Sequence, residues 1–149
     1  MVKVVVLDSA PLGLLANPNN TRAAVACRTW ANDLSAAGHR LVVPEIIDYE
    51  LRRELIRAGK VISVAALDAL ADQFEYLPLD TRTMRRAAEL WAQARRAGRP
   101  TADDKNIDAD MILVAQAQSL NDPGTVIATT NVRHLQPFHA AELWSNVTP

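Results

Sequence analysis

The chain has 149 residues, of which 16 are basic, 17 are acidic and 49% are hydrophobic, so its formal net charge is −1. This composition excludes a disordered chain and argues against a protein that binds nucleic acid by bulk charge alone. We therefore expect a single domain over residues 1–149, with no transmembrane helix and no signal peptide, in the cytoplasm. The single cysteine, Cys27, is expected to be a small helix side chain rather than a nucleophile.

The first expected element is a strand at the start of the chain. Val2 to Leu7 form an apolar run rich in β-branched residues, and the run ends at Asp8. Runs of this kind are typical of strands that are buried on both faces of a parallel sheet. In open α/β sheets the working groups lie just beyond the carboxyl ends of the strands, so Asp8 is the first candidate for a functional residue.

Helices and strands alternate along the rest of the chain. Capping residues, glycines and apolar stripes at helical spacing predict helices over residues 22–37, 44–58, 64–74 and 82–97, and a strongly apolar one around 111–115. Strands are expected at 40–43 and 125–130, with a short extended piece at 77–79. Residues 9–15 are expected to form a turn and a short apolar segment, and 132–149 a loop, a short turn and a tail. The order predicts an α/β layered domain with a mainly parallel sheet.

Several acidic and polar residues fall at the ends of these elements. Those expected near Asp8 are Glu50, Asp108, Asp110, Thr130 and Asn131. Carboxylates at a strand end and a helix start can converge on one rim of a sheet, where they repel one another unless a cation neutralises them. Oxygen ligands favour Mg²⁺ or Mn²⁺ over zinc. For Asp103 and Asp104 a helix-capping role is the stronger interpretation, and Glu54 is expected to pair with a nearby arginine on the surface.

Arginine supplies 13 of the 16 basic residues, and six arginines fall within one short span. They are Arg82, Arg85, Arg86, Arg95, Arg96 and Arg99. The span fits two interpretations equally well. It can be the solvated face of a helix, or it can be a binding surface, because the planar guanidinium of arginine matches phosphate bidentately. If the span binds a ligand, Arg85, Arg86 and Arg96 are the candidates for contacts with RNA phosphate or with an acidic protein segment.

Four stretches carry a resemblance to a known family. They are residues 5–13 (VVLDSAPLG), 45–55 (EIIDYELRREL), 108–117 (DADMILVAQA) and 126–135 (VIATTNVRHL). In this order they resemble the motifs of PIN-domain ribonucleases, and most closely those of VapC-type toxins of bacterial toxin–antitoxin pairs. The resemblance covers nearly the whole chain. It implies a three-layer PIN-like domain with a mainly parallel central sheet flanked by helices.

The resemblance also implies a function and a site. The function is hydrolysis of RNA phosphodiester bonds with Mg²⁺ or Mn²⁺, by a toxin that forms a homodimer and is neutralised by a cognate antitoxin. The family motifs place the catalytic residues and metal ligands at Asp8, Glu50 and Asp110. Asp108 or Asp104 is the candidate further ligand that would compensate for a missing fourth acid, with Thr130 and Asn131 in support. Asp108 lies about 200° from Asp110 around a helix, so the two point inward together only if the helix begins late. His134 stands where the family often carries an acidic residue.

Two other functions remain open at this stage. The substitution at His134 is compatible with a degenerate PIN-like module that binds RNA or protein without cleaving. A haloacid dehalogenase-type phosphatase also begins with an apolar strand and an aspartate, but that family has a second aspartate two residues later, where this chain has Ala10.

Overall fold

The computed structural model describes residues 1–98 and 104–149, with the backbone alone for residues 104–107. Five strands form one sheet in the order β3-β2-β1-β4-β5, and every pair of neighbours is parallel. The strands are β1 (Val4–Leu7), β2 (Arg40–Pro44), β3 (Glu75–Leu77), β4 (Thr125–Thr129) and β5 (Ala141–Leu143). The predicted sheet is therefore confirmed, and among the described residues it is wholly parallel.

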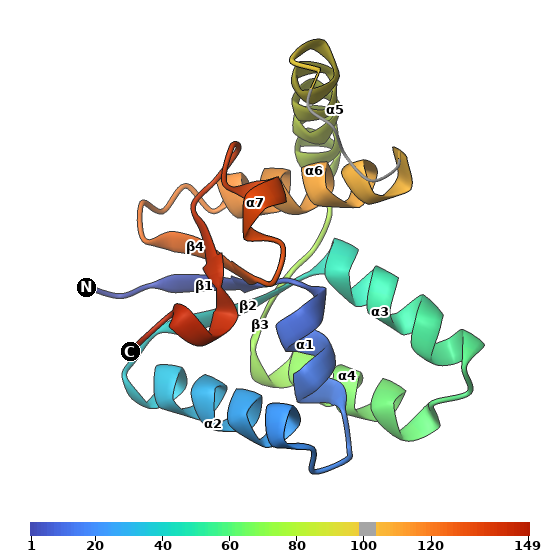
Figure 1. Ribbon diagram of the computed structural model, residues 1–149, viewed down its shortest axis with the longest axis vertical. Helices are drawn as coiled ribbons and strands as arrows, with labels where there is room; N and C mark the ends of the chain where they lie inside the picture. The colour runs from blue at the N-terminus through green and yellow to red at the C-terminus, as the bar shows by residue number, and fades with distance from the viewer. Residues whose placement is uncertain (99–103) are drawn as a thin grey trace.

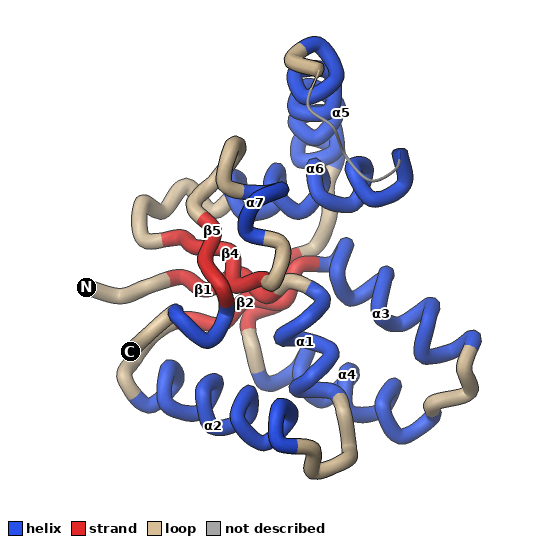
Figure 2. The backbone as a smooth tube through the Cα atoms, in the orientation of Figure 1, coloured by secondary structure: helices blue, strands red, loops and turns tan. Residues whose placement is uncertain are grey.

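Helices cover both faces of the sheet. They are α1 (Ser9–Ala16), α2 (Arg22–Ala36), α3 (Glu45–Arg57), α4 (Val61–Gln73), α5 (Thr81–Arg96), α6 (Asp104–Ser119) and α7 (Val132–Leu135). Figures 1 and 2 show α1, α2 and α4 on one side of the sheet and α6 and α7 on the other, while α5 packs on α6 and extends away from the sheet. The expected three layers are present. None of the helices in the described part of the chain is long and apolar enough to span a membrane.

The central strand explains why the opening run is so apolar. β1 pairs with β2 on one side and β4 on the other, and all four of its residues are fully buried. Leu7 pairs with Ala128, so the next residue of each strand, Asp8 and Thr129, lie side by side at the carboxyl edge. The continuous apolar pattern thus places the first acidic residue at the edge where α/β proteins carry their sites.

Helix ends follow the chemistry of the sequence. Thr21 caps α2 by accepting a hydrogen bond from the Ala24 amide at 3.1 Å, and Asp80 caps α5 through the Thr83 amide at 2.7 Å. Gly38 follows α2 with a φ of +85°, a conformation that glycine adopts without steric cost. These residues therefore mark where α2 begins and ends and where α5 begins.

Three expectations about secondary structure were wrong. Residues 9–16 form the helix α1 because the carboxylate of Asp8 caps it. The expected short turn near the end of the chain is the strand β5, which pairs with β4, and Val132–Leu135 is the short helix α7. The short extended piece expected at residues 77–79 is instead the strand β3 at Glu75–Leu77. This strand ends just before Pro78, which has no amide hydrogen to continue the ladder.

A buried glutamine joins three elements near the carboxyl edge. Gln116 of α6 has no exposed surface. Its side-chain oxygen accepts a hydrogen bond from the Ile46 amide at the start of α3 at 3.2 Å, and its amide nitrogen donates to the Leu77 carbonyl at the end of β3 at 2.8 Å. The first amides of a helix lack partners within the helix. Gln116 therefore satisfies one of them and holds α6 and α3 in fixed relation.

Candidate active site

Asp8 is the most firmly held acidic residue at the carboxyl edge. It is 5% exposed and follows β1 directly. One carboxylate oxygen accepts a hydrogen bond from the Ser9 amide at 2.7 Å, and the other accepts one from the Thr129 hydroxyl at 2.6 Å. Because each carboxylate oxygen has two lone pairs, both oxygens remain able to bind a further group. The side chain of Asp8 is thus oriented by the first residue of α1 and by the last residue of β4.

Glu50 and Asp110 come to the same edge from two helices. The pKa of Asp110 is raised to about 7, chiefly by burial and then by the negative charges of Asp8 and Glu50. The pKa of Glu50 is also raised, first by burial and then by the charge of Asp8, while the guanidinium of Arg53 acts in the opposite direction. The three carboxylates therefore interact with one another across the edge of the sheet. The structure brings together the three residues that the sequence motifs selected.

The cluster is close but open. Among the side chains that the structure describes, no three from His, Cys, Asp and Glu lie near enough to one another to hold one ion. The donor set itself fits a divalent cation, because three carboxylates offer only hard oxygen atoms and repel one another without a positive charge. Coordination by all three would require Glu50 and Asp110 to turn toward Asp8, which is already fixed by its hydrogen bonds.

The polar residues after β4 have different positions from those expected. Thr129 is buried and donates to Asp8, whereas Thr130 and Asn131, the predicted supporting residues, are exposed. Asn131 contributes through its backbone, since its amide donates to the Thr129 hydroxyl at 2.8 Å. His134 is exposed on α7. The contact between Thr129 and Asp8 was not predicted from the sequence. It follows from the strand register, because Asp8 and Thr129 each come one residue after the paired residues Leu7 and Ala128.

Asp108 is on another face of α6. It is exposed and lines a groove between α5 and α6 together with Met84 and Trp91. The helix begins at Asp104, well before Asp108, so Asp108 and Asp110 diverge as their two-residue separation requires. The structure therefore does not bring Asp108 to the other three carboxylates. Asp103 and the side chain of Asp104 lie outside the described residues.

A second acidic residue of α3 has a structural role. Asp48 is 8% exposed and accepts hydrogen bonds from the Tyr76 hydroxyl at 2.7 Å and from Arg52 at 2.9 Å. Arg52 also pairs with Asp68 of α4 at 2.7 Å. These bonds hold α3 against β3 and α4. Because the carboxylate of Asp48 already accepts these hydrogen bonds, it is not a candidate ligand. Glu50, two residues later on the same helix, is the residue that interacts with Asp8.

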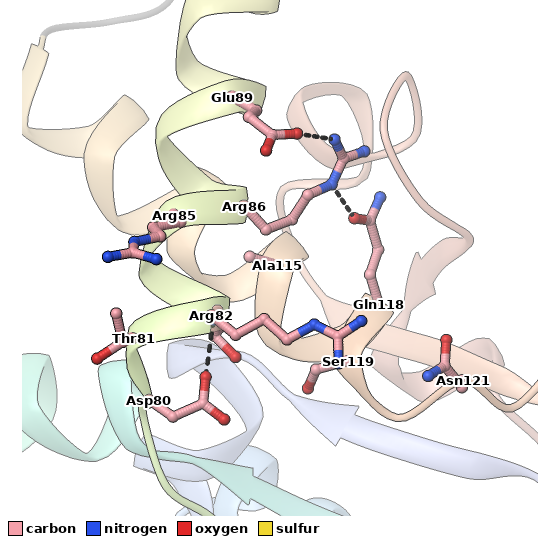
Figure 3. Close-up of a pocket in the computed structure, with 11 residues that line it drawn as sticks. Asp80, Thr81, Arg82, Arg85, Arg86, Glu89, Ala115, Gln118, Ser119 and Asn121 are labelled. Atoms are coloured by element: carbon pink, nitrogen blue, oxygen red, sulfur yellow. Dashed lines mark hydrogen bonds and ion pairs between the residues drawn. The ribbon is translucent and has the colours of Figure 1, made fainter.

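The described arginines of the arginine-rich span belong to α5 and do not line the acidic cluster. A cleft of about 780 Å³ lies between the first half of α5 and the end of α6 (Figure 3), and Arg82, Arg85 and Arg86 line it. Arg86 is held by Gln118 at 2.8 Å and by Glu89 at 3.0 Å. Arg96 is exposed in the last turn of the same helix. Arg99 lies outside the described residues.

Two smaller expectations were confirmed. Glu54 pairs with Arg57 on the exposed side of α3 at 2.7 Å. Cys27 is buried on α2, and burial raises the pKa of its thiol to about 12, which keeps the thiol protonated and unreactive at neutral pH.

Fold and site together define an α/β protein with a cluster of three carboxylates at the carboxyl edge of a parallel sheet. The profile of the PIN domain family matches residues 6–136, and the chain belongs to that family. PIN domains are generally nucleases that use divalent metals. No curated protein matches the sequence.

Solved structures share the fold. The chain is similar to a DNA-bound VapBC from Salmonella typhimurium, with 21% identity and a TM-score of 0.71 over 97% of this chain and 99% of the other. It is similar to VapBC-1 from nontypeable Haemophilus influenzae, with 20% identity and a TM-score of 0.67 over 96% and 99%. It is also similar to FitAcB from Neisseria gonorrhoeae, with 17% identity and a TM-score of 0.69 over 97% and 100%. At these identities the likeness is one of fold.

Proposed function

We propose that this protein is a metal-dependent endoribonuclease whose active site consists of Asp8, Glu50 and Asp110. The observation that carries the proposal is the mutual repulsion of the three carboxylates. Burial is the largest cause that raises the pKa of Asp110 to about 7, and the negative charges of Asp8 and Glu50 raise it further. A site that concentrates negative charge in this way is destabilised by itself and stabilised by a cation. Serine or cysteine nucleophiles are not needed for such chemistry.

The residues divide the work according to how they are held. Asp8 is the fixed ligand, since Ser9 and Thr129 orient it before any ion arrives. Asp110 and Glu50 would complete the ligand set by rotation of their side chains. A bound Mg²⁺ or Mn²⁺ supplies an activated water and offsets charge on the phosphate oxygens. Without a cation Asp110 keeps its proton up to about pH 7, and a bound cation would displace that proton.

The partner we propose is a cognate antitoxin, with the chain acting as a VapC-type toxin and forming a homodimer in the cytoplasm. Two lines support this part of the proposal. The similar structures were solved as VapBC and as FitAcB. The motif resemblance to VapC-type toxins extends over nearly the whole chain. A gene for a small antitoxin next to the gene for this protein is the simplest observation that tests it.

The test of the activity is cleavage of total RNA by the purified protein with Mg²⁺ or Mn²⁺, compared with the Asp8→Asn variant and with chelator present. We expect fragments only with wild type and metal, and a loss of at least about a hundredfold in the variant. Circular dichroism of the variant checks that it stays folded. Equal cleavage by both proteins, or equal cleavage in chelator, would contradict the proposal.

A second function is favoured by one feature of the cluster. The carboxylates are not at ligating distance among the described residues, and His134 replaces the acidic residue common in the family motif. Both features fit a PIN-like module that binds RNA or protein without cleaving it. Metal-independent RNA binding with no turnover at any metal concentration would identify this second function.

A further inference from the structure

The cleft between α5 and α6 is lined by an arginine, Arg82, that has no hydrogen-bond or ion-pair partner among the described residues. Arg82 and Arg86 project into it from one side of α5, one helical turn apart, whereas Arg85 points away from both (Figure 3). Gln118, Ser119 and Asn121 line the opposite wall. Residues three and four apart on a helix are neighbours on its surface, so Arg82 and Arg86 present their guanidinium groups together.

The acidic residues of the cleft do not pair directly with Arg82. Asp80 accepts the capping hydrogen bond of Thr83 at 2.7 Å, and Glu89 pairs with Arg86 at 3.0 Å. Hydrogen bonds from Thr83, and after them the charge of Arg82, lower the pKa of Asp80, so that group remains ionised and held at the cap. Neither carboxylate neutralises Arg82 by direct contact.

Several donors therefore lack acceptors. Arg82 forms no hydrogen bond or ion pair with any residue that the structure describes, and the same holds for the side-chain amide of Asn121. Gln118 uses its oxygen to accept a hydrogen bond from Arg86, and its NH₂ group points away from Arg82 (Figure 3). The guanidinium of Arg82 and the side-chain amide of Asn121 line the same cleft, and donors of this kind can bind an oxyanion.

We propose that this cleft binds a backbone phosphate of a single-stranded RNA, with Arg82 as its principal ligand. The inference rests on the proposed function, because it concerns how that site obtains its substrate. A cluster of three carboxylates repels a phosphodiester chain, so the strand needs a cationic contact elsewhere on the surface. The same helix connects both places: Gln118 follows Asp110 by eight residues, or about 12 Å along the axis of α6, which a few nucleotides span.

The geometry favours phosphate over an acidic protein segment. Phosphate oxygens point in several directions and accept from donors on different walls, and the fork of Arg82 matches two of them. Arg86 is fixed by Gln118 and Glu89, so it supplies charge nearby without leaving its own contacts. The cleft is also large enough, at about 780 Å³, to admit a nucleotide.

The experiment measures binding of a short fluorescein-labelled oligouridine by fluorescence anisotropy. All proteins carry Asp8→Asn so that the RNA stays intact. Arg82→Gln is compared with Arg22→Gln, which removes an equal charge from the exposed start of α2 in the opposite layer. We expect Arg82→Gln to weaken binding about fivefold and to reduce the slope of log affinity against log salt by about 0.7, while Arg22→Gln changes neither by much.

Other outcomes overturn the inference. Equal effects of the two substitutions would mean that only bulk charge attracts RNA. Binding of a labelled oligoglutamate that depends on Arg82, with RNA binding that does not, would identify a protein-binding cleft instead. Inorganic phosphate that binds through Arg82 without any change in RNA affinity would identify a small-anion site. If the wild-type protein never cleaves RNA while the Asp8→Asn proteins bind it through Arg82, the nuclease proposal is refuted and this inference stands.

Discussion

Asp8 and Asp110 belong to the same cluster but are held in opposite ways. Asp8 accepts hydrogen bonds from Ser9 and Thr129 at 2.7 Å and 2.6 Å, so its neighbours fix the orientation of its carboxylate. Asp110 stands on a helix that packs against the sheet, where burial and two nearby carboxylates raise its pKa to about 7. Two aspartates of equal chemistry are therefore held differently, one by hydrogen bonds and the other by burial among negative charges.

The difference assigns distinct roles to the strand end and the helix. The strand end is preorganised, which lowers the cost of binding an ion in a defined position. On α6, burial and the charges of Asp8 and Glu50 disfavour the ionised form of Asp110, so binding of a cation or a proton there is favourable. The site is therefore built from one fixed ligand and two that respond to their environment.

The largest expected effect comes from Asp110→Asn. Cleavage should fall by at least about a hundredfold, because a ligand is lost. Stability at pH 8 in chelator should rise, since the substitution removes a buried charge that is repelled by Asp8 and Glu50. Thermal unfolding and RNA cleavage on the same samples measure both effects. Asp8→Ala should instead lose activity and stability together, because the Ser9 amide and the Thr129 hydroxyl lose their acceptor. A drop in the stability of Asp110→Asn would contradict the account.

Replacement of Thr129 by valine should have a smaller effect on activity. The shape of the side chain is kept, but Asp8 loses a donor and the Asn131 amide loses its acceptor. Loss of such a supporting contact to a ligand reduces activity about ten- to a hundredfold. The matched control is Thr130→Val, which changes the adjacent exposed threonine and should leave cleavage unchanged. Equal cleavage rates for the two variants would show that the Thr129 contact does not position Asp8.

The smallest effect is on the pH dependence of stability. The pKa of Asp110 in the folded protein is about 7, above its ordinary value of 3.8. Between these values the folded state keeps a proton that the unfolded state has released, so stability from this group is complete below about pH 4 and is lost as pH rises through about 7. Urea unfolding across this range in chelator, for wild type and Asp110→Asn, isolates the contribution.

The comparison of Asp8 and Asp110 becomes sharper with Glu50→Gln. Removal of the negative charge of Glu50 should lower the titration midpoint of Asp110, because that charge is one of the causes that raise it. Carbon-13 NMR of the aspartate carboxyl groups measures the midpoint directly. A midpoint that does not move would mean that Glu50 is electrostatically separate from Asp110.

Much of the fold follows from patterns in the sequence. The opening apolar run, the capping residues and the glycine stops locate β1, α2, α3 and α5 to within a few residues, because those signals are local. The end of the chain was less predictable. β5 has only three residues, of which two are exposed, and its strand state depends on pairing with β4 rather than on its own composition.

The site divides in a similar way. Asp8, Glu50 and Asp110 could be selected because each follows or sits on an element with a strong pattern. The roles of Thr129 and Gln116 depend on strand register and on contacts between residues distant in the sequence, 121 and 70 positions apart. Asp108 shows the opposite case, since helical geometry alone indicates that it diverges from Asp110 once the helix is known to begin at Asp104.

The central claim is that Asp8, Glu50 and Asp110 hold one divalent cation together. Isothermal titration of Mn²⁺ at pH 8 into wild type and the variants Asp8→Asn, Glu50→Gln, Asp110→Asn and Asp108→Asn tests it directly. The account predicts that binding is lost in Asp8→Asn and Asp110→Asn, weakened in Glu50→Gln and retained in Asp108→Asn. Wild-type affinity in Asp8→Asn and Asp110→Asn, or loss of binding in Asp108→Asn alone, would contradict it.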